Sequence, residues 1–460
     1  MPAREEDPAL SSDEGQPISE RRAVAAAAMG NATEWFDYGV YATTASYLTD
    51  AFFPGSLGTL GTLLGFAISF VLRPLGGMVW GPLGDRVGRK AVLATTILLM
   101  ALATGAIGIL PTHTSVGVLA PVLLITLRVV QGFSTGGEYG GAATYIAESC
   151  GERRRGFLGS FLEFGTLSGF AGGSAVVLIC QVALPAHAMH AWGWRVPFLL
   201  AVPLGLVGWY LRARLAESPV FTEVAEADDR PQGGLRVLLR DYRREILTLA
   251  GLVLALNVVN YTLLAYMPTY LNKTIGMSDS ATTAMVLIGE LSMMCVLPFS
   301  GALSDRVGRR PMWLVSLIGL AVLAVPLYWL MGRGMVWAVA GFVVLGLLYV
   351  PQLSTISATF PAIFPTQVRY AGFALGYNVS TAAFGGTAPL INQWVIDRTD
   401  WILFPAFYTV GACLIGLVAW LFLRETAGAS LRGTDVPVTG ENPVIPAAAP
   451  PEPTTPPAVA

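Results

Sequence analysis

The sequence predicts an all-α membrane protein in which twelve transmembrane helices form two six-helix halves. Of its 460 residues, 54% are hydrophobic and only 13% are charged, whereas a soluble protein carries about 25% charged residues. A charged heptapeptide also occurs twice, as Gly84–Lys90 (GDRVGRK) and Ser304–Arg310 (SDRVGRR), each time between two long apolar segments. Such repeated loops indicate internal duplication, and two packed halves around a cavity are typical of secondary transporters.

Twelve segments are long and apolar enough to cross a bilayer, which takes about 20 residues. In chain order they are residues 22–47, 58–82, 91–111, 117–147, 157–184, 194–214, 246–271, 281–302, 312–331, 335–360, 370–396 and 402–424. We therefore expect an N-terminal tail (1–21), a first half (22–214), a polar linker (215–245), a second half (246–424) and a tail (425–460). The last segment is rich in Pro and Ala and lacks apolar periodicity, so it is expected to be disordered.

Basic residues in the short loops predict the orientation. Both heptapeptides, Arg153–Arg155, the linker and Arg424 fall on one side, whereas only Lys273, Arg333 and Arg398 fall on the other. We therefore expect both termini in the cytoplasm and a multi-pass protein of the cell membrane that works in the lipid bilayer as a monomer. The first 20 residues are polar and acidic, which does not fit a cleavable signal peptide.

Charged side chains inside the spans are the main functional signal, because each costs about 2.5–3.5 kcal/mol on insertion scales and needs a partner or a wet cavity. In the first span, Glu34, Asp37, Tyr38 and Tyr41 recur on one helical face. The other spans contain Arg73, Arg128, Glu138, Glu163, Arg195 and Glu290. Desolvation disfavours a charged carboxylate and a nearby arginine favours it, so alternating between these environments couples a site to protons. A pair such as Glu34 or Asp37 with Arg73 could equally be a structural clamp.

The fourth span carries a polar stripe, Arg128, Gln131, Thr135 and Glu138, at helical spacing. Gly132, Gly136 and Gly140 form a small-xxx-small ridge that allows a neighbouring helix to approach closely. In the heptapeptides, Asp85 and Asp305 can meet the positive end of a neighbouring helix or a partner arginine. Such contacts would latch the two halves on the cytoplasmic side, although a purely topogenic basic loop is the alternative.

Several motifs resemble a known family. Gly84–Lys90 is similar to the signature loop of the major facilitator superfamily. Gly30–Asp37, Arg128–Tyr139, Trp192–Phe198 and Phe364–Tyr370 resemble its metabolite:proton symporter branch. Within that branch, Gly156–Gly165 and Asn257–Pro268 look most similar to proline/glycine betaine transporters. The match runs from about residue 20 to 428. The osmosensing members carry a long charged coiled-coil extension, whereas the Pro/Ala-rich segment here shows no heptads, so we expect no C-terminal coiled coil.

The resemblance implies proton-coupled uptake of a small zwitterionic osmoprotectant such as proline or glycine betaine. In this hypothesis Glu34, Asp37, Arg128 and Glu138 serve proton coupling. Tyr38, Arg73, Glu163, Asn257 and Tyr261 contact the substrate. Asp85, Arg89, Asp305 and Arg309 form a cytoplasmic gate, and Glu290 is a candidate extra site, because an apolar or small residue is expected there.

Three alternatives remain at this point: a proton symporter of a di- or tricarboxylate, a drug efflux antiporter, and a membrane sensor that transports nothing. An enzyme is not expected, since no nucleophile–base pair or metal constellation is present. The four Cys and three His fit neither a disulfide framework nor a zinc site. We therefore expect no cofactor, no metal and no nucleic acid partner, and only the substrate and protons as ligands.

Overall fold

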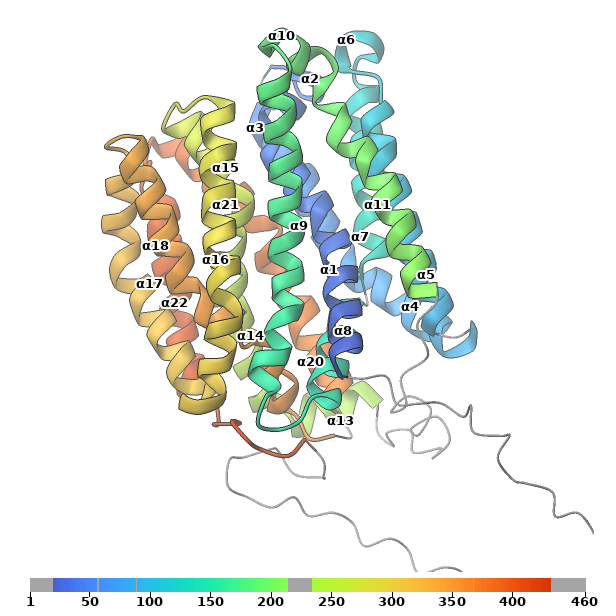
Figure 1. The fold of residues 1–460 in the computed structure, drawn as a ribbon, viewed down its shortest axis with the longest axis vertical. Helices are drawn as coiled ribbons and strands as arrows, with labels where there is room; N and C mark the ends of the chain where they lie inside the picture. Colours follow the sequence, from blue (N-terminus) through green and yellow to red (C-terminus); the bar gives the residue numbers. More distant parts are fainter. Residues whose placement is uncertain are drawn as a thin grey trace, which may run out of the picture.

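The computed structural model of the protein describes residues 20–55, 58–87, 89–136, 138–213, 234–366 and 368–431, and this part of the chain is a bundle of helices (Figure 1). A helix satisfies its backbone hydrogen bonds within one segment, as a bilayer requires. Seven of the described helices are long and apolar enough to cross a membrane. A bent pair, Ala186–Gly193 with Arg195–Tyr210, gives an eighth span.

The first half supplies six helical rods, some of which continue across a short break. They are α1 (Glu20–Thr43) with α2 (Ala45–Phe52), α3 (Gly58–Val71) with α4 (Arg73–Val87), α5 (Arg89–Ile109), α7 (Leu119–Ser134) with α8 (Glu138–Ser149), α9 (Arg155–Ala183), and α11 (Arg195–Ala213). Short helices α6 (His113–Val116), α10 (Ala186–Ala188) and η1 (Met189–Gly193) join rods at the upper end in Figure 1.

The second half also supplies six rods, after the short helix α13 (Gly234–Asp241). They are α14 (Arg243–Asn260) with η2 (Tyr261–Tyr266), α15 (Met267–Thr269) and η3 (Tyr270–Thr274); α16 (Asp279–Val307); α17 (Arg309–Met331); α18 (Met335–Leu353) with α19 (Ile356–Thr359); α20 (Arg369–Ser380) with η5 (Thr381–Gly385) and α21 (Thr387–Thr399); and α22 (Phe404–Trp420). The turn η4 (Pro361–Ile363) precedes α20. The π-helical segments η2 and η5 interrupt the seventh and eleventh rods, and such π turns are frequent at functional sites.

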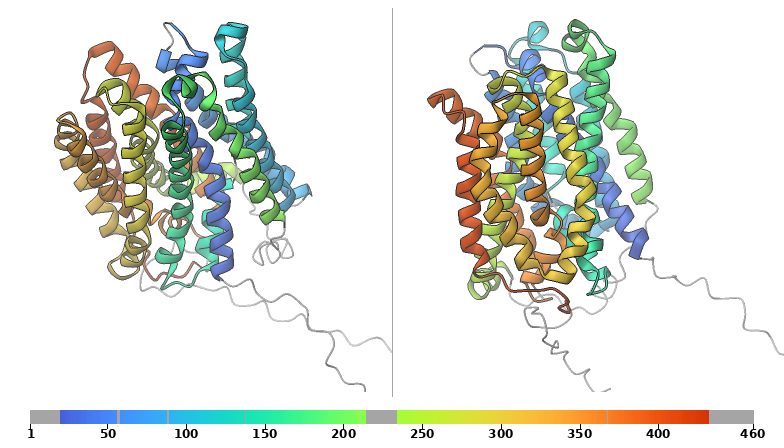
Figure 2. Two further views of the ribbon diagram at one scale, coloured as in Figure 1. Left: turned by 45° about the horizontal axis from the view of Figure 1, so that its top comes forward. Right: turned by 60° about the vertical axis from the view of Figure 1, so that its left-hand side comes forward.

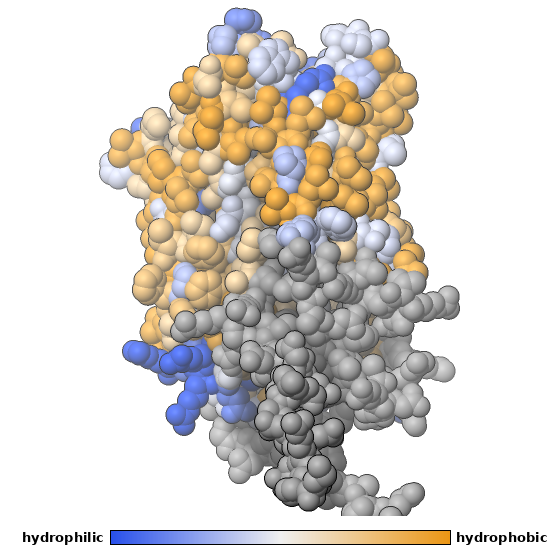
Figure 3. All heavy atoms as spheres, turned by 45° about the vertical axis from the view of Figure 1, so that its right-hand side comes forward, coloured by the Kyte–Doolittle hydropathy of each residue, from blue (hydrophilic) through white to orange (hydrophobic). Residues whose placement is uncertain are grey.

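Each rod corresponds to one predicted span. Three of the remaining helices are less apolar or shorter than a typical membrane span. The charged residues Glu34 and Asp37 lower the hydropathy of α1, and the apolar part of α5 (Ala94–Ile109) and α22 are short. Large apolar side chains face outward, with Met78, Phe299 and Val336 more than 70% exposed. Figure 3 shows an apolar side face between hydrophilic groups at the ends of the described bundle, which is the surface that a lipid bilayer covers.

Helices within the first half pack backbone against backbone. A Cβ on Gly132 would lie 2.0 Å from the carbonyl oxygen of Ser69 on α3, and one on Gly136 would lie 2.0 Å from that of Arg73. The glycine ridge therefore joins α7 to α3 and α4 as one unit. Between the halves, α9 and α16 run side by side (Figures 1 and 2). Their contacts join Gly156 to Ser304 and Ser160 to Gly301.

Candidate functional site

A buried ion pair links α1 to α7. Nη1 of Arg128 donates to the Asp37 carboxylate at 2.9 Å and to Oε1 of Gln131 at 2.7 Å. Nε2 of Gln131 donates to the other Asp37 oxygen at 2.9 Å. Arg128 and Gln131 are fully buried and Asp37 is 2% exposed. The spacing of Arg128 and Gln131 places both donors on one face of α7, so together they compensate the Asp37 charge.

A second cluster on the same face of α1 surrounds Arg73, the first residue of α4. Nη2 of Arg73 lies 3.5 Å from Glu34 and donates to the Tyr38 hydroxyl at 2.9 Å. Its guanidinium also lies 4.4 Å from the ring centroid of Phe70 and 5.7 Å from that of Trp35. Within the described part of the chain, the buried Nε of Arg73 has no hydrogen-bond partner. Arg73 therefore keeps one donor for another ligand, since a buried orphan donor costs about 1–3 kcal/mol.

Aromatic rings close the space between the two halves beside Arg73. Tyr261, the first residue of η2, places its ring 4.9 Å from Phe70, 6.1 Å from Phe66 and 6.3 Å from Trp35. Asn257 lies one helical turn earlier and donates to Thr381 of η5 at 2.9 Å. The two π-helical segments thus meet next to this aromatic cluster, where electron-rich ring faces suit a cation.

Glu163 on α9 forms a third polar cluster. It accepts a hydrogen bond from the Tyr139 hydroxyl and another from Thr166 at 3.0 Å. Thr166 in turn accepts from Asn31, one turn before Glu34 on α1, at 2.6 Å. The ring of Tyr139 stacks on Tyr377 of α20 with centroids 4.6 Å apart. A carboxyl of the first half is therefore connected through one tyrosine to the second half.

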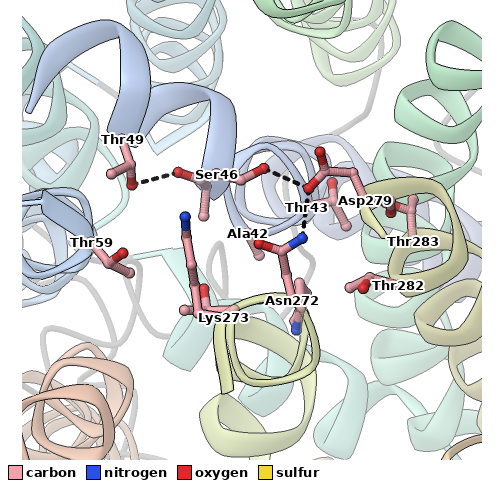
Figure 4. Close-up of a pocket in the computed structure, with 13 residues that line it drawn as sticks. Ala42, Thr43, Ser46, Thr49, Thr59, Asn272, Lys273, Asp279, Thr282 and Thr283 are labelled. Atoms are coloured by element: carbon pink, nitrogen blue, oxygen red, sulfur yellow. Dashed lines mark hydrogen bonds between the residues drawn. The ribbon is translucent and has the colours of Figure 1, made fainter. Parts of the chain in front are cut away.

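At the upper end in Figure 1, polar residues of both halves meet around Asp279, at the start of α16. Ser46 of α2 donates to Asp279 at 3.0 Å and Asn272 of η3 donates at 2.8 Å (Figure 4). These residues line a small, open pocket together with Lys273. His190 lies 3.2 Å from Asp50 and 4.0 Å from Asp279. Of these contacts, those of Ser46 and His190 with Asp279 join the two halves at this end.

At the opposite end, the second heptapeptide joins the halves. The Asp305 carboxylate accepts from the backbone N–H groups of Gly156 and Phe157, both at 2.8 Å, in the first turn of α9. Arg309 donates to the same carboxylate at 2.8 Å. Nearby, Arg369 of α20 forms an ion pair with Glu148 of α8 at 2.9 Å. An anion at a helix N-terminus is favoured by the helix dipole, so Asp305 links α16 to α9 electrostatically.

The segment after α22, residues 421–431, is the C-terminal strap, and it differs from the disordered tail predicted from residue 425. Glu425 accepts from the backbone N–H groups of Arg309 and Arg310 at 2.8 and 2.9 Å. The carbonyl of Leu431 accepts from Arg369 at 2.8 Å, and that of Ala429 accepts from Arg155 at 2.9 Å. The strap is ordered because it caps α17 and supplies carbonyls to buried arginines. Residues 432–460 lie outside the described part.

The structure thus brings Glu34, Tyr38 and Arg73 together beside Tyr261, and Asp37 together with Arg128. Glu163 is hydrogen-bonded to Tyr139 and Thr166, and Asn257 is hydrogen-bonded to Thr381, and within the described part of the chain neither is hydrogen-bonded to Arg73. Glu290 lies on α16, away from these residues. The side chains of Asp85, Arg89 and Glu138 lie outside the described residues, so half of the predicted gate and one predicted coupling residue are not placed. Sequence reasoning did not single out Asn31, although Asn31 lies in the Gly30–Asp37 motif, and it missed the ion pair of Glu148 with Arg369.

The profile of the Major Facilitator Superfamily matches residues 27–389, and the chain belongs to this family. Among curated relatives, it is 39% identical over 430 residues to the glycine betaine/proline/ectoine/pipecolic acid transporter OusA of Dickeya dadantii, covering 90% of this chain and 85% of the relative. It is 38% identical over 426 residues to the proline/betaine transporter of Escherichia coli K12, with the same coverage. The ectoine/proline transporter of Corynebacterium glutamicum is 40% identical over 434 residues, which cover 90% of this chain and 86% of that relative.

Solved structures agree on the fold. A crystal structure of a D-xylose–proton symporter superimposes with a TM-score of 0.71 at 20% identity, covering 88% of this chain and 98% of that one. A partially occluded inward-open form of the xylose transporter XylE from Escherichia coli gives 0.67 at 18% identity, covering 88% and 97%. The predicted fold class, twelve helices in two six-helix halves, and the predicted family are confirmed.

Proposed function

We propose that this protein is a proton-coupled symporter that takes up a small zwitterionic osmoprotectant such as proline or glycine betaine. Relatives of about 40% identity, matched over nine tenths of this chain, carry proline, betaine or ectoine in their names. The observation in the structure that carries the proposal is Arg73. It lies between Glu34 and a cluster of aromatic rings at the contact of the two halves and retains an unpaired buried donor.

The geometry around Arg73 supports a competition mechanism. A zwitterion brings a carboxylate, which can bind Arg73 in place of Glu34. Glu34 then loses its cationic partner in a site without bulk water, and protonation stabilises it. The cationic group of the substrate can lie against the rings of Trp35, Tyr38, Phe70 and Tyr261. Binding of substrate and binding of a proton therefore favour each other.

The remaining site residues take related roles in this proposal. Asp37 and Glu138 also serve proton coupling, and Arg128 controls the charge of Asp37 through their ion pair. Glu163 and Asn257 complete the substrate site from opposite halves. Asp85, Arg89, Asp305 and Arg309 gate the cytoplasmic side, for which the contacts of Asp305 with α9 give support. A contact between the halves that must break on opening suits a gate.

A proton symporter of di- or tricarboxylates is the main rival. Such a substrate needs arginines that are free of internal acids, because each carboxylate must be matched by a cation. Arg128 is already paired with Asp37, and Arg73 lies beside Glu34. This arrangement favours a substrate with one carboxylate and one cationic group.

The location and organisation are part of the proposal. The protein is a multi-pass membrane protein, and we place it in the cell membrane as a monomer in lipid, with both termini in the cytoplasm. We assign residues 22–214 and 246–424 to the two halves and residues 215–245 to a cytoplasmic linker. The excess of Lys and Arg on one side supports this orientation.

Uptake of labelled glycine betaine and proline into proteoliposomes, with and without an inward proton gradient, tests the function. We expect accumulation only with the gradient, competition by unlabelled proline, and none by 2-oxoglutarate. Arg73→Gln should abolish accumulation, whereas Arg333→Gln, which removes an exposed arginine stacked on Trp329, should transport as wild type does. Gradient-driven uptake of 2-oxoglutarate instead would establish the carboxylate alternative.

A further inference from the structure

Glu290 is a buried acid that the proposed mechanism leaves unused. It lies in the middle of α16, in a span of 29 residues, and is 1% exposed. Neither carboxylate oxygen has a hydrogen-bond partner within the described part of the chain. The buried acids of the first half, by contrast, each accept a hydrogen bond or lie beside an arginine: Glu34 lies near Arg73, Asp37 pairs with Arg128, and Glu163 accepts from Tyr139. Glu290 therefore differs from them in having no compensating group.

The side chain points into the seam between the two halves. Contacts along α9 and α16 pair Gly156 with Ser304, Ser160 with Gly301, and Ser168 with Met294. Continuing this antiparallel register brings Ser174 of α9 opposite Glu290, and the Ser174 hydroxyl is indeed its neighbour. Ser174 is fully buried and its hydroxyl also makes no hydrogen bond of good geometry. The carboxyl and the hydroxyl thus face each other across the contact that must change when the halves rock.

The titratable groups named here on the helices packed against α16 make other contacts or lie at the ends of the bundle, although the hydroxyls of Tyr328 and Tyr270 have no hydrogen-bond partner within the described residues. Glu163 of α9 lies 11 residues from Ser174, about 16 Å along the helix, and accepts from Tyr139. Tyr349 of α18 donates to Asn260, and the Tyr328 ring of α17 packs on Tyr270 of η3 at 5.3 Å. Asp279 and Lys273 lie at the end of the bundle that holds the pocket, and Arg309 of α17 lies at the other end with Asp305. No cation among these described groups is placed to balance a Glu290 carboxylate.

We propose that Glu290 is a second proton-binding position, separate from Glu34 and Asp37, that holds a proton while α9 and α16 are packed together. An unpaired carboxylate in a dry span is unfavourable, and a neutral acid beside a hydroxyl is not. When the halves separate at this level and water enters, the O–H bond of the acid breaks and the proton passes to that water. The released proton leaves as hydronium on the cytoplasmic side, and when the site next faces the opposite side the carboxylate takes a proton from hydronium there before the seam closes. The proposal rests on proton-coupled transport as the function of the protein.

The first test is infrared spectroscopy of purified protein in lipid, which needs no transport. Wild type should show the carbonyl stretch of a protonated carboxyl group that persists at neutral pH, and Glu290→Gln should lack it. Ser174→Ala, which keeps the acid, should shift the band because it removes the neighbouring hydroxyl. Asp241→Asn, an acid with a side chain 55% exposed, should leave it unchanged. A band that persists in Glu290→Gln, or that Ser174→Ala does not move, overturns the proposal.

The second test is the ratio of protons to substrate, measured from the reversal potential in proteoliposomes. We expect the ratio to fall by one proton in Glu290→Gln, with substrate exchange retained. An unchanged ratio in folded protein overturns the second site, even where the Michaelis constant changes, because that pattern indicates a substrate contact only. If wild type shows no gradient-driven uptake, the proposed function fails while the infrared result still decides the protonation of Glu290.

Discussion

The rings of Tyr139 and Tyr377, from opposite halves, lie nearly parallel with their centroids 4.6 Å apart and an interplanar angle of 13°. Stacked aromatic pairs contribute about 0.5–1.5 kcal/mol beyond their area. Tyr377→Ala should weaken the closed contact and lower the transport rate, whereas Tyr377→Phe keeps the ring and should stay close to wild type. Uptake rates in proteoliposomes compare the two. Equal rates for the alanine and phenylalanine variants would show that the stack does not matter.

Removing one partner of the Asp37–Arg128 pair should be strongly destabilising. Breaking a buried pair leaves an uncompensated charge and costs about 3–5 kcal/mol. Arg128→Ala should therefore lower the melting temperature of the purified protein markedly. Arg128→Lys should not restore it, because lysine cannot make the same directed set of hydrogen bonds.

A neutral pair gives the control for this prediction. Asp37→Asn combined with Arg128→Gln removes both charges and should melt at a higher temperature than Arg128→Ala alone, although it should not couple protons. If Arg128→Ala melts at the same temperature as wild type, the pair is not a stabilising contact.

The glycine ridge of α7 should not tolerate a methyl group. A Cβ on Gly132 would lie 2.0 Å from a backbone oxygen of Ser69, and backbone cannot move aside cheaply. Gly132→Ala should therefore separate α7 from α3 and reduce the yield of folded protein in size-exclusion chromatography.

Gly411 in α22 supplies the matched control, since a Cβ there meets nothing within 4 Å. Gly411→Ala should fold at least as well as wild type, because alanine is favoured over glycine in a helix interior by about 1 kcal/mol. Equal yields of the two variants would contradict the close contact at Gly132.

The contact of Asp305 with α9 should protect two backbone amides. Asp305→Asn removes the charge that faces the helix N-terminus, an interaction of about 0.3–1 kcal/mol. Hydrogen exchange at Gly156 and Phe157 should become faster, while exchange in the middle of α9 should not change. Asp400→Asn, at an exposed turn of positive φ that asparagine also adopts, should leave both amides unaffected. Unchanged exchange in Asp305→Asn would mean that this carboxylate does not join the halves.

The spans and the candidate residues could be predicted because long apolar runs and charges within them are local signals. The pairing of those charges could not. Arg73 lies beside Glu34 and Tyr38, whereas Asp37, on the same helical face, pairs with Arg128. Which acid meets which arginine depends on how α1 packs against α4 and α7, and the sequence spacing within α1 is compatible with either choice.

The ordered structure of residues 425–431 could not be predicted from the sequence for a related reason. Residues 425–431 (ETAGASL) contain no proline, but they are short and, like the Pro/Ala-rich sequence beyond them, show no apolar periodicity. Glu425 caps α17 and the carbonyls of Ala429 and Leu431 accept from two arginines. Such capping depends on partners more than 50 residues away in the chain, and composition does not report it.

The C-terminal strap has a mechanical consequence. It leaves the second half at α22, and its final residues bind Arg155 of the first half and Arg369 of the second. A fluorescent reporter fused after Leu431 would therefore be held at the contact between the two halves, which separate from each other at this end when the cavity opens. A label at that point would report each transport cycle as a change in its distance to the first half. A large fused domain at the same point would slow the transport cycle.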